Sequence, residues 1–325
     1  MPESGCAGKG GVEDVRTTAT DPFVHPALFY RDEQEYLAGT LPFLEAGLAA
    51  GEPVAVAVPG ANLRLIREGL GPAADAVLLL DMREAGRNPG RIIPGVLRAF
   101  ADAQPSGRRV RIIGEPIWAG RSAAEYPACA QHEALINAAF TGREVSILCP
   151  YDESRLDDRV LTDAHATHPV VIPAGSTEER PSGAYDPDGV VASYNLPLPA
   201  APRVPARHFD AACLPTARDH AVAEGERLGL TGTRLGDFAL TASELSTNSV
   251  LHGGGSGELR VWAEDEHVVC EVRDRGRITD PLAGRRPPRR DQLGGRGLLL
   301  VNLVADLVRL HTGDRGTAVR AWFAR

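Results

Sequence analysis

The stretch Thr241-Ala-Ser-Glu-Leu-Ser-Thr-Asn-Ser-Val-Leu-His252 decides the fold of the C-terminal part of the chain. Glu244 and Asn248 are four residues apart, so on a helix they project from the same side. An amide oxygen can hold a hard cation, and a carboxylate can orient or deprotonate a nucleophile, as magnesium-assisted phosphate chemistry requires. Taken alone, such a pair is also typical of a solvated helix face. Apolar residues on or near one face of this helix are Leu240, Leu245 and Leu251.

The segments around this helix predict a small α+β domain. A helix-like segment precedes it, and two apolar runs follow it across the polar turn Glu264-Asp-Glu266, which is typical of a hairpin. Helices on one face of a mostly antiparallel sheet form a two-layer α+β sandwich. The expected helices are 215–228, 233–252 and 296–307, and the expected strands are 258–262, 267–272, 307–310 and 317–322.

Three short clusters lie downstream of the helix. Asp274-Arg-Gly276 follows the second hairpin strand, where a carboxylate can accept a hydrogen bond from an amine while the backbone packs against a flat base. Gly294-Gly-Arg-Gly297 precedes a helix, and free amide groups at a helix N-terminus can hold phosphates. Gly316-Thr317 opens the last strand. Each cluster alone is equally an ordinary turn or helix entry.

In this order, the motifs resemble the nucleotide site of the GHKL ATPase superfamily, which has the Bergerat ATP-binding fold. The sequence of residues 244–252 and the C-terminal position of the domain resemble those of the anti-sigma-factor serine/threonine kinase branch. The resemblance implies that the protein binds ATP and Mg²⁺. It also implies that Asn248 coordinates the metal, and that Glu244 is the catalytic base that takes a proton from the acceptor hydroxyl.

The same resemblance implies how the rest of the nucleotide is bound. Asp274 would bind the adenine amine, with Thr317 nearby, and Gly276 would allow close approach to the base. Gly295 and Gly297 would leave room for the phosphates. Phosphoryl transfer depends chiefly on positioning and charge neutralisation, so few side chains suffice.

Two features of this region leave questions open. The family often has a second glycine where this chain has Ile278, and loss of a glycine restricts the backbone. The arginine-rich segment 285–290 is expected to be a lid whose arginines neutralise phosphate charge, or equally a solvated loop.

The N-terminal part alternates between apolar runs and helix-like segments, which predicts a parallel sheet covered on both faces. The expected strands are 54–58, 76–80, 110–113 and 145–148, and the expected helices are 32–50, 61–70, 90–103 and 122–141. Polar or turn residues follow these strands, and ligands bind at the carboxyl ends of strands in such sheets, so we expect a pocket there with Trp118 nearby. The first strand-to-helix turn, 59–63, lacks the glycines and lysine of a phosphate-binding loop.

The N-terminal part resembles the MEDS sensory domain, a RecA-like α/β module without a phosphate loop that is thought to sense small molecules. The resemblance rests on His25-Pro-Ala-Leu-Phe-Tyr30, on 35–37 and 51–56, on Gly114-Glu-Pro116 and on the helix that carries Glu133. His25 and Tyr30 are hypothesised to line the pocket.

Composition divides the chain into four parts. Residues 1–20 lack periodicity and are expected to be disordered, and residues 173–205 are rich in Pro, Gly, Ser and Asp, which is typical of a linker. The sensory domain is therefore expected at 21–172 and the ATPase domain at 206–325.

The net charge of −8 argues against a nucleic-acid or anionic-membrane binder. No secretory signal or transmembrane run is visible, which indicates a cytoplasmic protein. The five cysteines are widely spaced without a CxxC pair, so reduced thiols are expected and a metal site or disulfide is not.

We therefore expect an ATP-dependent protein serine/threonine kinase controlled by a small molecule that binds the sensory domain. Its protein partner would be an anti-sigma-factor antagonist or a sigma factor, and whether the chain forms a homodimer stays open. One alternative is a sensor histidine kinase, for which His132 is the only candidate phosphoacceptor, although a helix of the sensory domain is the simpler interpretation. Another is a non-catalytic ATP-binding switch that sequesters its partner.

Overall fold

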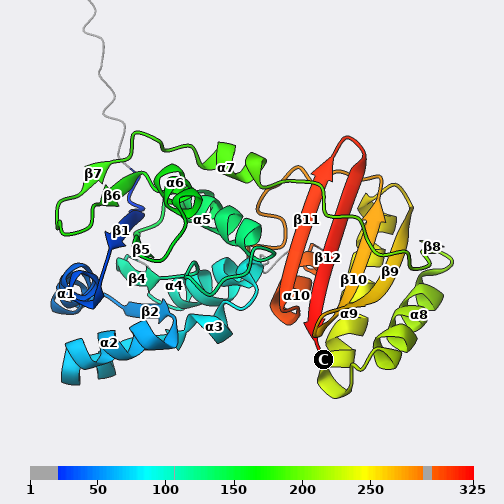
Figure 1. The fold of residues 1–325 in the computed structure, drawn as a ribbon, viewed down its shortest axis with the longest axis horizontal. Helices are drawn as coiled ribbons and strands as arrows, with labels where there is room; N and C mark the ends of the chain where they lie inside the picture. The colour runs from blue at the N-terminus through cyan, green and yellow to red at the C-terminus, as the bar shows by residue number, and fades with distance from the viewer. Residues whose placement is uncertain (1–20, 106, 288–294) are drawn as a thin grey trace, which may run out of the picture.

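The computed structural model describes residues 21–105, 107–287 and 295–325 (Figure 1). Its strands form two separate sheets. The first has seven strands in the order β3-β2-β4-β5-β1-β6-β7, and the second has five in the order β11-β12-β10-β9-β8. An α/β domain is therefore followed by an α+β domain, as expected. The disorder predicted for 1–20 concerns residues outside the described ones.

The N-terminal sheet is parallel except for the short strand at its edge. Its elements are β1 (Pro26–Tyr30), α1 (Glu33–Ala49), β2 (Val54–Val58), α2 (Gly60–Leu70), η1 (Gly71–Ala76), β3 (Val77–Asp81), α3 (Met82–Ala85), η2 (Pro89–Arg91), η3 (Ile93–Leu97), α4 (Arg98–Asp102), β4 (Val110–Gly114), α5 (Tyr126–Phe140), β5 (Val145–Asp152), α6 (Asp158–Thr167), β6 (Val170–Ile172), β7 (Arg180–Pro181) and α7 (Pro187–Ser193). The four expected strands are present. The strands β1 and β6 and the helix α6 were not predicted.

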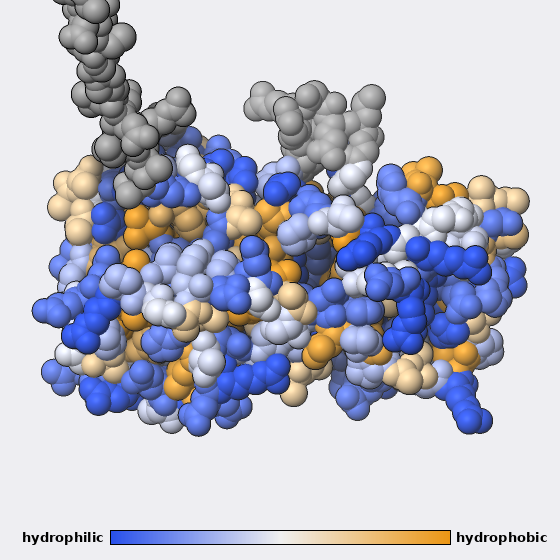
Figure 2. Space-filling model, turned by 90° about the horizontal axis from the view of Figure 1, so that it is seen from above, coloured by the Kyte–Doolittle hydropathy of each residue, from blue (hydrophilic) through white to orange (hydrophobic). Residues whose placement is uncertain are grey.

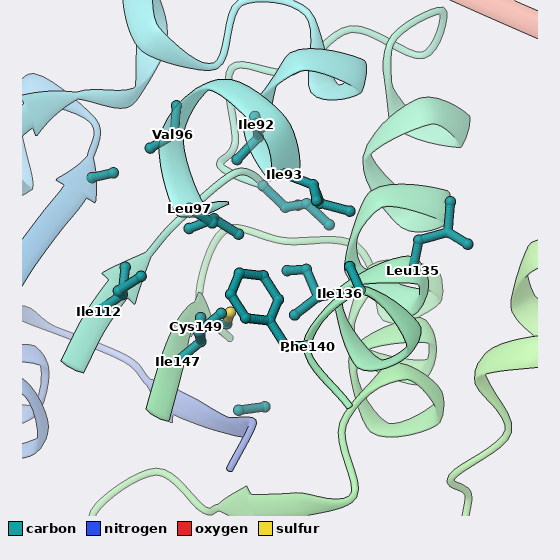
Figure 3. Packing of buried hydrophobic residues seen from close by; sticks show 14 of the residues in the cluster. Ile92, Ile93, Val96, Leu97, Ile112, Leu135, Ile136, Phe140, Ile147 and Cys149 are labelled. Carbon is teal, nitrogen blue, oxygen red and sulfur yellow. The ribbon is translucent and has the colours of Figure 1, made fainter. Parts of the chain in front are cut away.

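Alternate residues of the central strands build two hydrophobic cores, one on each face of this sheet. In β5, Ile147 and Cys149 join one core, whereas Leu148 joins the other. Figure 3 shows Phe140 at the centre of the first core, between the sheet and residues of η3 and α5. Because both faces are covered, every residue of β1 and β2 is buried, and both strands are apolar throughout.

The C-terminal sheet is antiparallel and carries its helices on one face (Figure 1). Its elements are β8 (Arg207–Asp210), α8 (Leu214–Arg227), α9 (Gly232–His252), β9 (Ser256–Glu264), β10 (His267–Asp274), α10 (Gly297–Val304), β11 (Leu307–Gly313) and β12 (Gly316–Ala324). The predicted hairpin is β9–β10, and its turn places Asp265 at φ 48°. The strand β8 was not predicted.

The buried face of α9 differs from the predicted one. Phe238, Ala242, Leu245 and Ser249 are buried against the sheet, at spacings of four, three and four residues. Leu251 is instead 67% exposed, because six residues after Leu245 it lies about 120° around the helix from that residue, on the face that carries Glu244 and Asn248. The face that packs on the sheet is therefore not the predicted one, and the face of Glu244 and Asn248 is left free.

The expected linker at 173–205 is partly folded. It includes β7, which extends the first sheet, and α7, which packs against α5 through Val190 and Tyr194. Proline at the first position of α7 and the Asp186 cap explain why a helix forms in this polar segment. Residues 195–206 have no helix or strand, and they cross the second sheet (Figure 1).

The two domains are packed together. The helix-free face of the second sheet buries Trp262 and Trp322 in one hydrophobic cluster with Ala128 of α5 and with Ala201 and Val204. Arg320 ties the crossing segment to the sheet, because its guanidinium donates to the carbonyl oxygen of Pro199 and pairs with Glu271. The surface seen from above is mostly hydrophilic, with hydrophobic residues in scattered groups (Figure 2).

Candidate functional site

Helix α9 presents Glu244 and Asn248 toward the first residue of α10. A Cβ atom built on Gly297 would lie 2.7 Å from Glu244 Oε2 and 3.0 Å from Asn248 Nδ2. Both side chains are half-buried. The structure thus brings together three predicted site residues from two helices, and any larger residue at position 297 would fill the space between them.

Asp274 ends strand β10 beside the same helix. Its Oδ2 accepts a hydrogen bond of 2.7 Å from Ser249 Oγ, and its Oδ1 accepts one of 2.8 Å from the Gly276 amide. A Cβ at Gly276 would lie 2.5 Å from the carbonyl oxygen of His252, so the loop can pass the end of α9 only with glycine here. The carboxylate is therefore held at a fixed place by groups from the helix and the loop.

Thr317 lies opposite Asp274 in the β10–β12 pairing. Its hydroxyl donates to the carbonyl oxygen of Gly276 at 2.9 Å and is 2.9 Å from the hydroxyl of Thr312. Thr312 Oγ1 in turn accepts from the Ile278 amide at 3.0 Å. The antiparallel register thus places Thr312 and Thr317 beside Asp274. Their hydrogen bonds hold the loop that follows Asp274 in place.

These residues surround a cavity of about 420 Å³, which we call the nucleotide cavity. A cavity of this volume is typical of small-molecule sites. Glu244 does not line it but faces Gly297, which does. The predicted residues that line the nucleotide cavity are Asn248, Asp274, Gly276, Gly295, Gly297 and Thr317.

Sequence reasoning missed two polar residues of this site, Ser249 and Thr312. Ser249 adjoins Asn248 in the opening motif, and one helical step turns it toward Asp274. Thr312 could have been found from the hairpin register, because it pairs directly with Thr317. Ile278 lines the nucleotide cavity, and among the described residues the only non-glycine residue with positive φ is Asp265, so the backbone conformation at position 278 does not require glycine.

The expected lid is described only in part, because residues 288–294, which include Gly294, lie outside the described residues. Arg286 pairs with Asp280 at 3.3 Å. Arg285 lies close enough to α5 to help lower the pKa of His132 there. Both arginines were expected to face phosphates. In the structure Arg286 instead pairs with Asp280, and Arg285 lies near His132 of the N-terminal domain.

A second and larger cavity, of about 920 Å³, lies at the carboxyl ends of β1, β2, β4 and β5. We call it the sensory cavity. Burial raises the pKa of Glu115 to about 8, although Asn62 donates to both of its oxygens at 2.8 and 3.0 Å. Tyr30 and Trp118 line the cavity, as hypothesised. A carboxyl group that is neutral near pH 7 can donate a hydrogen bond to a bound molecule.

The hypothesis that His25 lines this cavity is wrong. His25 precedes β1, is 1% exposed, and points to the other side of the strand, where its Nδ1 is 3.1 Å from Asn137 Oδ1. The alternation of side chains along a strand explains the error, since Tyr30 is an odd number of residues away and faces the opposite side.

Two family models match the chain. Residues 24–169 match the model described as MEthanogen/methylotroph, DcmR Sensory domain, abbreviated MEDS, and residues 208–323 match the histidine kinase-like ATPase domain. The order of the two matches, MEDS in the N-terminal part and histidine kinase-like ATPase in the C-terminal part, is the order expected from the sequence. Both resemblances read from the sequence are thereby confirmed at the level of the domain. The nucleotide cavity lies within the ATPase domain, and the sensory cavity within the MEDS domain.

Among the solved structures that match is the Acinetobacter baumannii histidine kinase AdeS. It is 10% identical, with a TM-score of 0.22, and the match covers 42% of this chain and 72% of that one. No curated protein matches the chain. Across the described residues, no helix is both long and apolar enough to span a membrane.

Proposed function

We propose that this chain is an ATP-dependent protein serine/threonine kinase of the anti-sigma-factor type, regulated by its MEDS domain. The observation that carries the proposal is the convergence of Glu244 and Asn248 on Gly297, beside a cavity that Asp274 and Thr317 also line. In this proposal Glu244 lies beside the phosphates of the nucleotide, and the Asp274 carboxylate binds its base.

The residues around Gly297 fit a magnesium nucleotide, because the glycine leaves open the space in front of the Asn248 amide. Bound Mg²⁺, held by the Asn248 oxygen, would neutralise charge on the phosphates. Asp274 orients the base by accepting from its amine, while Gly276 and Thr317 hold that carboxylate and its loop in place. Glu244 would accept the proton of the acceptor hydroxyl as that oxygen attacks the terminal phosphorus, and the bond from this phosphorus to the bridging oxygen would break, so that ADP leaves.

His132, the candidate phosphoacceptor of a histidine kinase, fits that role poorly. His132 is only 1% exposed, in the middle of α5, and burial lowers its pKa to about 3. A phosphoacceptor must reach the phosphate of a bound nucleotide, and a ring enclosed by its own domain cannot do so. This favours a hydroxyl on a separate protein, an anti-sigma-factor antagonist or a sigma factor, as the acceptor or bound partner.

Regulation by the MEDS domain is supported by a chain of contacts between the cavities. Trp118 lines the sensory cavity, and the Arg121 guanidinium stacks on it 4.0 Å from the ring centroid. Arg121 also donates to the carbonyl oxygens of Gly86 and Arg87, which begin the loop leading to η2. A ligand that moves Trp118 therefore acts on this loop.

The same loop contacts the ATPase domain at α10. Asn88 is fully buried, donates to the Asn302 carbonyl oxygen at 2.8 Å and accepts from the Val308 amide at 3.3 Å. Asn302 Nδ2 donates to the Gly284 carbonyl oxygen, beside the nucleotide cavity. A shift of η2 would thus reposition α10, whose first residue faces Glu244. In this proposal the MEDS domain is a RecA-like module that senses a small molecule in the sensory cavity.

The test measures phosphotransfer from γ-labelled ATP with Mg²⁺. The reaction is run with the full chain alone and with candidate partner proteins that were isolated by their binding to the full chain. Acid-stable label on serine or threonine of a partner is the expected result. Acid-labile label on the chain itself would favour a histidine kinase, and nucleotide binding without transfer would favour a non-catalytic switch. Either of the last two outcomes overturns the serine/threonine kinase assignment.

A further inference from the structure

Four side chains that neither cavity uses meet inside the MEDS domain. They come from the segment before β1, from α5, from β5 and from the turn between α6 and β6, and each is at most 1% exposed. One donor atom of each lies within 4.8 Å of the corresponding atom of every other. The four residues, which we call the buried donor cluster, are His25, Glu133, Cys149 and His168.

The distances within the cluster are those of ligands around one ion. Glu133 Oε2 is 3.5 Å from His25 Nε2 and 3.3 Å from His168 Nε2, and Cys149 Sγ is 3.5 Å from His25 Nε2. For tetrahedral zinc, bonds of about 2.0–2.3 Å place neighbouring ligand atoms roughly 3.3–3.7 Å apart. Three of the six distances between the four donor atoms therefore already match those of a tetrahedral zinc site.

The outer ring nitrogens of both histidines are fixed by acceptors. His25 Nδ1 is 3.1 Å from Asn137 Oδ1, and His168 Nδ1 is 2.8 Å from the Ala164 carbonyl oxygen. Asn137 turns its oxygen to His25 because its Nδ2 donates to two carbonyl oxygens. Acceptors at both Nδ1 atoms keep the proton there, so both Nε2 atoms present lone pairs to the centre, which is how metal-bound histidines are oriented.

The centre of the cluster lacks the donors that its oxygens require. Neither carboxylate oxygen of Glu133 has a hydrogen-bond partner, nor does His168 Nε2. Two lone pairs that face a buried carboxylate repel it, and burying such a charge without a partner is unfavourable. A cation at the centre would satisfy all four groups at once.

We propose that the buried donor cluster is a structural site for a divalent transition metal, with Zn²⁺ the ion that fits best. Two imidazoles, a thiolate and a carboxylate suit Zn²⁺, and four protein ligands close the coordination sphere, as in structural sites. When the metal binds, a metal–sulfur bond replaces the sulfur–hydrogen bond of Cys149, and the proton leaves to solvent. The site joins β1, β5, α5 and the α6–β6 turn, so it stabilises the MEDS domain.

The decisive experiment is metal analysis of the purified full chain, followed by replacement of the metal with Co²⁺. The expected result is about one metal ion per chain, and a tetrahedral cobalt spectrum with a thiolate-to-cobalt charge-transfer band. If the purified chain retains no metal and gives no cobalt spectrum, the proposal is overturned, and the buried donor cluster is a set of buried polar side chains without a metal. A cobalt spectrum without the thiolate band would also overturn it, since the ion would then be bound elsewhere.

Two cysteine variants separate ligation from packing. Cys149→Ala should abolish the thiolate band and lower metal content at least tenfold, whereas Cys129→Ala should leave both unchanged, because Cys129 is equally buried on α5 but is not in the cluster. Equal metal content in the two variants would refute the site. Should Cys149→Ala fail to fold, the cobalt spectrum of the wild-type chain still decides. A chelator should lower the Tm of the wild-type chain.

Discussion

The nucleotide cavity and the sensory cavity both lie at strand ends, but they are assembled from different kinds of sequence. The nucleotide cavity takes most of its predicted polar groups from four short motifs within residues 245–317, each tied to one helix or strand end. The sensory cavity takes single residues from four strand ends spread from Tyr30 to Arg155. A site made of motifs can be recognised in a sequence, whereas a site made of single residues emerges only when the sheet order is known.

The largest expected effect concerns the chemistry of the nucleotide cavity. Glu244→Ala should reduce phosphotransfer by about 10²–10⁴-fold, the usual contribution of a catalytic base, and should leave ATP affinity nearly unchanged. Asn248→Ala should weaken both, because it removes the metal ligand. Measurements are single-turnover transfer and ATP titration by calorimetry.

The matched control for this prediction is Glu226→Ala, an exposed glutamate on the neighbouring helix α8. It should behave as the wild-type chain in both measurements. Unchanged transfer by Glu244→Ala would remove the base assignment and leave the nucleotide cavity as a binding site alone.

The second effect belongs to the sensory cavity and depends on pH. The pKa of Glu115 rises from 4.5 to about 8 on folding, so the folded state keeps a proton that the unfolded state releases. Its contribution to stability is complete below pH 4.5 and is lost as the pH rises to about 8. The loss is on the order of 4–5 kcal/mol if the full shift is realised.

Chemical denaturation between pH 5 and pH 8 tests this prediction. The wild-type chain should lose stability relative to Glu115→Gln, whose amide cannot ionise, across that range. Glu68→Gln, an exposed change at the same cavity, should follow the wild-type chain. Parallel curves for wild type and Glu115→Gln would mean that Glu115 is already ionised at pH 5.

The same contrast explains what could be predicted from the sequence. Periodicity and motif order predicted α9, the β9–β10 hairpin and six residues that line the nucleotide cavity, because those signals are local. The face of Leu251 was misjudged, because a side chain six residues after Leu245 points away from the packed face of the helix. The roles of Glu244 and Asp274 stay predictions.

Contacts between residues far apart in the sequence gave no pattern that periodicity or motif order could reveal. The linker prediction missed α7, which begins at a local signal, the Asp186 cap, but is held in place by packing of Val190 against α5. Spacing rules for metal ligands found nothing at Cys149, whose neighbours in the buried donor cluster come from three other parts of the chain. Contacts of this kind depend on strand order, which composition and periodicity do not specify.

A smaller effect is expected where the two domains meet. Asn88→Ala leaves the Asn302 carbonyl and the Val308 amide without their buried partner, at a cost of about 1–3 kcal/mol. If η2 positions α10, this variant should also change ATP affinity. Arg309→Ala, which removes a domain contact to Ala124 that does not involve α10, should not. Equal ATP affinity in both variants and in the wild type would break the proposed link between the cavities.

The smallest expected effects on stability come from two exposed glycines of α9 that differ in backbone conformation. A Cβ at Gly236 or at Gly232 would meet no atom within 4 Å, but Gly232 has φ 52° and Gly236 does not have positive φ. Gly236→Ala should therefore stabilise the ATPase domain by about 0.5–1 kcal/mol, and Gly232→Ala should destabilise it by a similar amount. Because the domains share buried contacts, calorimetry should show one transition that moves up with the first variant and down with the second. Two transitions, of which only one moves, would show that the MEDS and ATPase domains unfold independently, and the contacts of Asn88 would then be too weak to couple their cavities.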